Sequence, residues 1–459
     1  MPLSLPTILR IVIEKTLPLT VGVFAIMMVQ LVDSIFIGML GVNELAVHGI
    51  TLPFQAAFTG VQVGMGVAAT SIISQAVGAK NSRKASSMAT LSVGAGMVTI
   101  ALLCFVLILF SDWVFHSFIA DVPPQQYQLL LAVFNQYWPV WLMSALSVAL
   151  LYLMTCIYRA NGDTKTTGSM FLGASIINLI LDPILIFWLD MGIAGAAVAS
   201  TMGYLTCSFY MLIKVQGRGW FGLSDASIEQ IKQDASELVR TVIPTTMNQI
   251  LPSVSAFFTM WLIAHMGTSE MAFWSLLSRV ESFVLVMSLA LTMSIPPMIG
   301  RYLGAKQHHR IPELLKTSAL FLLTFHLVIA AVLALSSGLL ASALSDEATI
   351  QHWFEVSLLF IPFSFGPLGL CMLVASVFNA LGLPKQALNV SFARLFIFYI
   401  PALWIGASTG EMIYAVVAAS CANVLAGGFA WLRLSRYVKE NIETKSTKTS
   451  CQGTLRTEC

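Results

Sequence analysis

Residues 87–111 read SMATLSVGAGMVTIALLCFVLILFS and contain no charged side chain. An α-helix rises about 1.5 Å per residue, so a run of this length crosses the roughly 30 Å apolar core of a bilayer. A strand of an outer-membrane barrel would need only about ten residues and would alternate polar and apolar side chains. This stretch therefore predicts a membrane-spanning α-helix.

Similar apolar runs recur along the whole chain. Together they predict twelve transmembrane helices, at residues 12–39, 46–77, 87–111, 126–157, 167–189, 192–215, 238–266, 271–302, 314–342, 351–381, 386–407 and 410–434. The composition agrees, because 57% of the residues are hydrophobic and 10% are charged, whereas soluble domains carry about 25% charged residues. We expect an all-α membrane protein of two six-helix pseudo-symmetric bundles, and we exclude a soluble enzyme, a disordered chain and a disulfide scaffold.

Positive charges are distributed unevenly among the loops. Of the 24 lysine and arginine residues, 22 lie at the chain ends or in every second loop, as at Lys80 and Arg159, whereas the loops between hold acids such as Glu44 and Asp190. The positive-inside rule then places both termini in the cytoplasm, which predicts a multi-pass protein of the plasma (bacterial inner) membrane. A net charge of only +2 argues against a nucleic-acid partner.

The two halves of the chain share a register of 226 residues: V-G-A-K ending at Lys80 matches L-G-A-K ending at Lys306. After a six-residue slip, A-N-G-D-T-K (160–165) matches A-L-G-L-P-K (380–385). Six is an even number, so both copies run in the same direction, as in transporters whose parallel repeats open a cavity to alternate sides. We expect an N-lobe at 1–215, a cytoplasmic linker at 216–237, a C-lobe at 238–435 and a polar cytoplasmic tail at 436–459.

Two aspartates lie inside expected helices of the first half. An ionisable group at that depth costs several kcal/mol and therefore suggests a functional role. Asp33 and Asp182 should both lie about 8–12 Å below the outer surface. Asn178 is one turn before Asp182 and shares its helix face, and Thr201 reaches a similar depth. We expect these four side chains to converge from three helices.

This cluster is a candidate cation-coupling site. Two carboxylates in a low-dielectric pocket do not comfortably both ionise, so one should hold a proton near neutral pH. The oxygens of Asn178 and Thr201 could instead complete a sodium site. The alternative is a purely structural role, in which each aspartate only forms hydrogen bonds across a buried contact between helices.

Pro18 is a candidate hinge in the first helix, since a proline there removes one backbone hydrogen bond and kinks the helix. Our hypothesis is that protonation of Asp33 loosens its links to Asp182 and Asn178, after which the helix bends and squeezes the cavity. A static kink fitted by packing is the alternative.

The second half is not a chemical copy of the first. Thr259 stands at the position that matches Asp33. The intramembrane charges here are Arg279, Glu281 and Arg394, and the expected depths of Glu281 and Arg394 nearly coincide. We expect a structural ion pair, which leaves the coupling site in the first half only.

The cavity wall is expected to be apolar and adaptable, because the chain holds 22 methionines and 28 phenylalanines. Such a surface suits varied organic cations. Gln30, Tyr137 and Asn161 are the polar candidates for substrate contact. We expect no cofactor and no metal centre, with H⁺ as the coupling ion and Na⁺ as the second choice.

Several of these residues carry a family resemblance. The stretch G-A-S-I-I-N-L-I-L-D-P-I-L-I-F (173–187) with G-I-A-G-A-A-V-A-S-T (192–201) resembles the multidrug and toxic compound extrusion (MATE) family. So do V-D-S-I-F-I-G-M-L-G (32–41) and G-M-G-V-A-A-T-S-I-I-S-Q-A-V-G-A-K (64–80). The acidic pattern is similar to the DinF-like branch, whose first-lobe aspartates match Asp33 and Asp182 and carry coupling. Asn178 and Thr201 match its accompanying polar positions, with Ser200 as an alternative to Thr201.

The resemblance implies a twelve-helix antiporter that exports organic, often cationic, compounds through the membrane. The second-lobe acids of the NorM-like branch, which coordinate sodium, are missing here. We expect a monomer in membrane lipid, and no enzyme. Two alternatives remain: a lipid-linked saccharide flippase, which would need several cationic residues for a pyrophosphate, and an intramembrane aspartyl protease, whose usual G-x-G-D signal is missing from the sequence.

Overall fold

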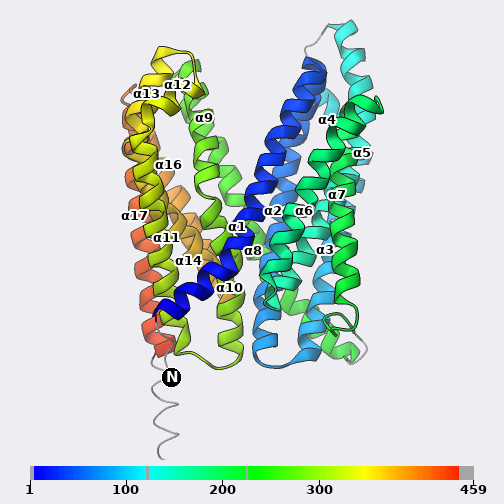
Figure 1. Ribbon diagram of the computed structural model, residues 1–459, viewed down its shortest axis with the longest axis vertical. Coiled ribbons are helices and arrows are strands. Elements are labelled where there is room, and N and C mark those ends of the chain that lie inside the picture. The colour runs from blue at the N-terminus through cyan, green and yellow to red at the C-terminus, as the bar shows by residue number, and fades with distance from the viewer. Residues whose placement is uncertain (1–4, 120–122, 224–225, 444–459) are drawn as a thin grey trace, which may run out of the picture. The chain divides into compact units, whose positions relative to one another are not determined.

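The computed structural model describes residues 5–119, 123–223 and 226–443, and all regular structure in these ranges is helical (Figure 1). The long helices of the first half are α1 (Leu5–Leu40), α2 (Val42–Gly78), α3 (Ser82–Leu109), α5 (Pro124–Ala160), α6 (Thr164–Pro183) with the π-helical η1 (Ile184–Trp188), and α7 (Gly192–Val215). Those of the second half are α8 (Ile228–Ala264), α9 (Thr268–Val284), α10 (Val286–Gly304), α11 (Arg310–Leu335), α14 (Ile361–Ala380), α15 (Pro384–Phe392) with η2 (Ala393–Tyr399) and α16 (Ile400–Ala407), and α17 (Met412–Val438). Shorter elements are α4 (Ser111–Phe118), α12 (Ser337–Leu344), α13 (Ala348–Leu358) and η3 (Lys439–Glu443).

Within the described residues, 11 helices are long and apolar enough to cross a membrane. The pair α9 and α10, bent by 42° at its break, brings the number to 12 when it is taken as one span. The predicted all-α fold of twelve membrane helices is therefore confirmed. Residues 444–459, most of the expected polar tail, lie outside the described residues.

The helix expected at residues 238–266 begins earlier, at Ile228. Its first turns are charged and pair with the start of α3. Arg83 Nη1 lies 2.9 Å from Asp234 Oδ2, and Lys84 Nζ lies 2.7 Å from Glu237 Oε2. Apolar runs identify only the part of a helix that can lie in the bilayer, so hydropathy did not locate these polar turns.

The repeat is visible in the backbone of the turns. Lys80 and Lys306, which follow the ends of α2 and α10, both have a positive φ, of 56° and 58°. Gly162 and Gly382, which follow α5 and α14, have φ of 93° and 77°. Non-glycine residues seldom adopt the left-handed conformation. Its recurrence at two matched lysines therefore supports the register found in the sequence.

The chain divides into two compact units. Unit 1 holds residues 1–20, 74–80 and 247–459, and unit 2 holds 21–73 and 81–246. The border in α1 lies between Thr20 and Val21, just after Pro18. Each unit thus takes most of one repeat and a short segment from the other.

Unit 2 contains the candidate coupling residues of the first half. In it α7 packs along α5 and α6, and α3 packs along α5. The ring centroids of Phe134 and Trp138 are 5.0 Å apart, and those of Trp138 and Trp141 are 5.4 Å apart. These rings on α5 belong to a buried apolar cluster that also includes Ile37 of α1 and Val47 of α2. The cluster fixes how α1, α2 and α5 face one another.

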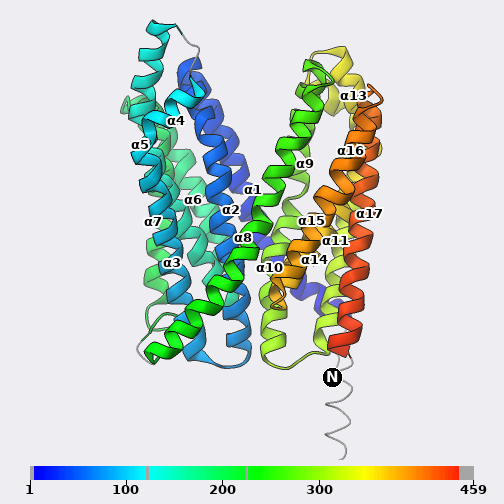
Figure 2. The same cartoon turned by 180° about the vertical axis from the view of Figure 1, so that it is seen from behind.

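Unit 1 is built around α14, which packs along α10, α11 and α17, while α17 also packs along α16 (Figure 2). The last turn of α2 lies against α10 in this unit at a glycine contact. A Cβ on Gly78 would meet the backbone of Arg301, and a Cβ on Gly304 would meet the backbone of Gln75. In the 226-residue register Gly78 matches Gly304 and Gln75 matches Arg301, so the contact is reciprocal.

Candidate functional site

Asp182 lies where the regular helix of α6 ends. Pro183 follows it and has no backbone N–H to donate, and the chain continues as the π-helical η1. The backbone N–H of Leu189 donates to the carbonyl of Ile184 at 2.9 Å, which is π-type spacing. Such π segments interrupt helices mostly at functional positions. Asp182 itself is fully buried.

Asn178 joins the site from one turn earlier on α6 and is 3% exposed. The amide orientation that satisfies all its neighbours has its nitrogen donating to Asp33 Oδ1 at 3.0 Å. Its oxygen then accepts from the Ser200 N–H at 3.2 Å and from Ser200 Oγ at 2.9 Å. In the opposite orientation the nitrogen donates to Asp182 Oδ1 at 3.4 Å. Asn178 therefore connects α6 with α1 and α7.

The carboxyl groups of Asp33 and Asp182 lie within hydrogen-bonding reach of each other. An ionised carboxylate can only accept a hydrogen bond, so a hydrogen bond between the two requires that one of them carries a proton. Tyr137 of α5 lies within electrostatic range of Asp33, and Tyr204 of α7 lies within range of both aspartates. The arrangement can hold one proton between a half-buried carboxyl group, Asp33, and a fully buried one, Asp182.

The structure thus brings Asp33, Asn178 and Asp182 together, as the sequence predicted. Thr201 does not complete the cluster, because its hydroxyl donates to the Ala197 carbonyl of its own helix at 2.7 Å. Ser200 takes that place. One residue along an α-helix turns the side chain by about 100°, so a depth estimate alone could not separate the two. The family resemblance, too, leaves Ser200 open as an alternative to Thr201.

The three residues predicted to contact substrate lie in different surroundings. Gln30 is exposed on α1. Tyr137 is 3% exposed, and its hydroxyl lies 3.1 Å from His48 Nδ1. Asn161 follows the last residue of α5, and its amide donates to the Ile157 carbonyl of the same helix at 2.9 Å. Asn161 thus caps a helix end, whereas Tyr137 interacts electrostatically with Asp33.

The ion pair predicted in the second half is not formed. Glu281 and Arg394 interact electrostatically, but among the described residues no contact within 4.0 Å joins them. Tyr399 interacts electrostatically with both Glu281 and Arg394. The side chain of Arg279 is exposed. Equal depth in the membrane does not fix the direction in which two side chains point around their helices, and this is why the sequence prediction failed.

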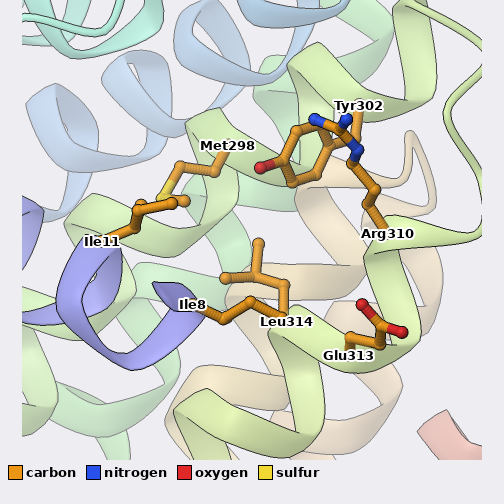
Figure 3. A pocket seen from close by; sticks show the side chains of 7 residues that line it. All are labelled: Ile8, Ile11, Met298, Tyr302, Arg310, Glu313 and Leu314. Carbon is orange, nitrogen blue, oxygen red and sulfur yellow. The ribbon is translucent and has the colours of Figure 1, made fainter. Parts of the chain in front are cut away.

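A separate pocket lies in unit 1, between the start of α1, the end of α10 and the start of α11 (Figure 3). It has about 240 Å³ of empty volume, open mouth included, and is lined by Ile8, Ile11, Met298, Tyr302, Arg310, Glu313 and Leu314. The Arg310 guanidinium lies over the Tyr302 ring, 5.8 Å from its centroid. Apolar runs and charge patterns did not single out this pocket, because its lining residues come from three separate helices.

The family follows from a direct comparison. The model of the family named MatE matches residues 18–184 and 244–405, one match in each repeat, and the chain belongs to this family of transporters. Its structure is similar to that of the Vibrio cholerae MATE transporter VcmN in the bent form. The sequences are 38% identical over 95% of this chain and 98% of that one, with a TM-score of 0.89.

Two curated relatives differ in what their names say they transport. A FAD transporter of Shewanella oneidensis is 27% identical over 96% of this chain and 97% of its own length. The multidrug export protein MepA of Staphylococcus aureus is 23% identical over 75% of each chain. A MOP superfamily transporter from Pyrococcus furiosus, 17% identical, covers 94% of this chain and 96% of its own with a TM-score of 0.84. That last likeness concerns the fold alone.

Proposed function

We propose that this protein is a multidrug efflux antiporter that exchanges protons for organic, often cationic, compounds. The observation that carries the proposal is the close approach of the Asp33 and Asp182 carboxyl groups in unit 2, within hydrogen-bonding reach of each other and with Asp182 fully buried. Removing or adding the shared proton changes the charge of the pair by one unit in a low-dielectric setting. Such a change can bias a two-state helix.

Protons rather than sodium ions are favoured by the direction of the Asn178 amide. A sodium ion would require the amide oxygen to point toward the carboxylates, since a hard cation binds oxygen ligands. In the orientation that satisfies its neighbours, the amide nitrogen faces Asp33 and the oxygen faces Ser200. An N–H donor at that position competes with a cation for the same carboxylate. Sodium coupling remains the alternative that the test below addresses.

Pro18 is the proposed point at which α1 bends during transport. It lies in the interior of α1, next to the border at which the helix passes from unit 1 to unit 2. Proline removes one backbone hydrogen bond and so weakens the helix at this point. We propose that protonation of Asp33 releases the upper part of α1 from Asn178 and Asp182, and that bending at Pro18 accompanies the rocking of two lobes.

The second candidate substrate is FAD, because the relative named as a FAD transporter spans nearly the whole chain. FAD is an anion with a pyrophosphate group, which a cationic side chain would have to accommodate. A lipid-linked saccharide flippase would meet the same requirement. The multidrug proposal draws on MepA, whose name describes multidrug export, and on the adaptable apolar wall that methionine and phenylalanine side chains provide.

The proposed location is the plasma (bacterial inner) membrane with both termini in the cytoplasm. The basis is the distribution of lysine and arginine over alternate loops. On this orientation the end of α1 that carries Asp33 and the start of α2 face the outside. The protein would then take protons from the outer medium and release them inside.

The test is ethidium efflux from loaded cells that express the chain. We expect a proton ionophore to stop efflux and sodium removal to leave it unchanged. Asp33→Asn should reduce efflux to the level of cells without the protein while the variant remains in the membrane. Thr259→Val, at the matched position of the second half, serves as the control and should keep nearly full activity.

Two results would contradict the proposal. Loss of efflux only on sodium removal would replace the proton with sodium, and full activity of Asp33→Asn would remove the aspartate from the coupling site. Release of FAD into the medium, measured in parallel by fluorescence, decides between the two candidate substrates.

A further inference from the structure

The pocket in unit 1 contains two opposite charges (Figure 3). Arg310 and Glu313 lie in the first turn of α11, and both line the pocket. The Arg310 guanidinium is turned toward Tyr302 of α10 and lies 5.8 Å from the ring centroid, within the range of a cation–π contact. Among the described residues no contact within 4.0 Å joins Arg310 to Glu313. The positive and the negative group are thus held apart inside one pocket.

The guanidinium has a hydrogen-bond donor that the protein does not use. The Nε atom of Arg310 is buried and has no partner among the described residues, whereas most buried polar groups in native proteins are hydrogen-bonded. His309, the residue before α11, makes no side-chain cap. The positive end of the helix dipole is therefore also available to an anion. Both features indicate that an anionic group binds at Arg310.

The remaining wall of the pocket is apolar. Ile8 and Ile11 reach it from the first turns of α1, Met298 from α10 and Leu314 from α11. Ile8, Met298 and Leu314 are 6%, 5% and 2% exposed. A small inorganic ion would gain nothing from these side chains, whereas an amphiphile would bury its hydrocarbon part against them. The lining therefore favours a ligand that is charged at one end and apolar at the other.

The position and the size of the pocket restrict its occupant further. The candidate membrane spans begin at Pro6 in α1 and at Arg310 in α11, so the pocket lies where helices enter the bilayer, at the level of the lipid headgroups. Its empty volume is about 240 Å³, open mouth included, which is below the roughly 300–1,000 Å³ of pockets for drug-sized ligands. A lipid headgroup fits these limits better than a transported drug does.

We propose that this pocket binds one aminophospholipid of the surrounding membrane. The lipid phosphate accepts hydrogen bonds from the Arg310 guanidinium, whose fork of N–H donors matches phosphate oxygens. The primary ammonium of the headgroup donates to the Glu313 carboxylate, and the start of an acyl chain packs against Ile8 and Ile11. The inference does not depend on the proposed transport chemistry. It uses the proposed membrane orientation only to assign the lipid to the inner leaflet.

The Glu313 carboxylate selects among phospholipids. A choline headgroup carries a positive charge but has no N–H to donate, whereas a primary ammonium has three N–H donors. A glycerol headgroup has no positive charge and would leave its phosphate beside an uncompensated carboxylate. On α1, Arg10 and Glu14 flank the pocket residue Ile11 in sequence, but they bind each other at 2.8 Å and are 80% and 52% exposed. They add no second pair of charges to the site.

The experiment titrates the purified full-length protein in detergent with defined lipids and counts bound lipids by native mass spectrometry. The probes are the dioleoyl phospholipids with ethanolamine, choline and glycerol headgroups. We expect one ethanolamine lipid to bind about tenfold more tightly than the choline lipid, because a hydrogen bond to the carboxylate is lost in the latter. Soluble glycerophosphoethanolamine, which has no acyl chains, should bind at least about tenfold more weakly than the lipid.

Two variants separate the two charges. Arg310→Gln should weaken the binding of ethanolamine and choline lipids alike, about tenfold, because both carry the phosphate. Glu313→Gln should weaken only the ethanolamine lipid and remove its preference. The matched control is Arg433→Gln on α17, which should keep both affinities. Arg433 also lies over a ring, 6.0 Å from the centroid of Phe429, but it donates to Gln386 Oε1 at 2.7 Å and does not line the pocket.

Equal affinity of the unaltered protein for the ethanolamine and choline lipids would overturn the inference, and so would tighter binding of the glycerol lipid. If soluble glycerophosphoethanolamine binds as tightly as the lipid, the site takes a free headgroup compound and the proposed lipid is wrong. If Arg310→Gln does not fold, Glu313→Gln decides, and a preserved preference in that variant rejects the site. Ethidium efflux does not enter this measurement, so a failure of the proposed transport function remains distinguishable.

Discussion

The two repeats of this chain agree in their turns and differ in their buried polar residues. Lys80 and Lys306 share a left-handed backbone, with φ of 56° and 58°. In contrast, the position of Asp33 is occupied in the second repeat by Thr259. Glu281, an acid expected inside the membrane in the second repeat, lies on a different helix and makes no direct ion pair with any residue that the structure describes. The backbone constraints of the fold were thus retained in both copies, while one copy acquired a carboxyl pair.

This difference separates residues that the packing of the fold restricts in both repeats from residues that serve a function in one repeat. A turn that needs a positive φ, or a helix contact without room for a Cβ, restricts the residue in both repeats. A buried carboxyl group is costly and is retained only where it has partners. Asp182 has such a partner in Asp33, which in turn accepts from the Asn178 amide, and the comparison can be tested by altering matched positions in the two repeats.

The largest effect is expected at the buried acids. Asp182→Asn should lower the rate of ethidium efflux about tenfold to a hundredfold, because a hydrogen bond to a charged group contributes roughly 1.5–3 kcal/mol. Glu281→Gln, in the second repeat, should change the rate less than twofold. The measurement is initial efflux at equal amounts of protein in the membrane. Equal losses in both variants would show that coupling is shared between the repeats.

A smaller effect, now on stability, is expected where the repeats still agree. Gly78→Ala and Gly304→Ala each place a Cβ against the backbone of the matched helix. Overpacking of this kind costs about 1–3 kcal/mol. Both variants should therefore melt at a lower temperature in detergent, and by similar amounts.

Gly94 on α3 is the control for these variants, because a Cβ there meets no atom within 4 Å. Gly94→Ala should leave the melting temperature unchanged or raise it, since alanine is favoured over glycine inside a helix by about 0.5–1 kcal/mol. A clear difference between Gly78→Ala and Gly304→Ala would mean that this contact, too, has diverged.

The smallest effect on the rate of efflux is expected at two adjacent residues of α7 in the first repeat. Ser200 binds Asn178, whereas the Thr201 hydroxyl bonds to its own helix. Ser200→Ala should slow efflux about fivefold, which corresponds to a hydrogen bond worth about 1 kcal/mol. Thr201→Ala should have little effect on the rate. The reverse order would show that α7 turns its other face to Asn178 during transport.

Sequence reasoning succeeded where a pattern is periodic or repeated. The spans followed from apolar runs such as residues 87–111, and the repeat followed from the matched G-A-K turns. The approach of Asp33, Asn178 and Asp182 could be predicted, because depth and helical spacing place all three near one level.

It failed where the direction of a side chain around its helix decides the contact. Ser200 rather than Thr201 meets Asn178, and Glu281 does not touch Arg394, although depth alone allowed both expected contacts. Arg159 was assigned to a loop, but it is 3% exposed and lies over the Tyr152 ring of α5, 5.6 Å from its centroid. A hydropathy pattern contains no information on such tertiary contacts.

The reciprocal glycine contact has a consequence for the origin of the chain. Gly78 packs against the backbone of Arg301, and Gly304 packs against the backbone of Gln75. In the repeat register Gly78 matches Gly304, and Gln75 matches Arg301. Two identical subunits related by a twofold axis make contacts of this kind. A half-length ancestor could have closed the same contact as a homodimer before gene fusion joined the two copies. Only after fusion could a single copy gain an acidic pair without altering its twin.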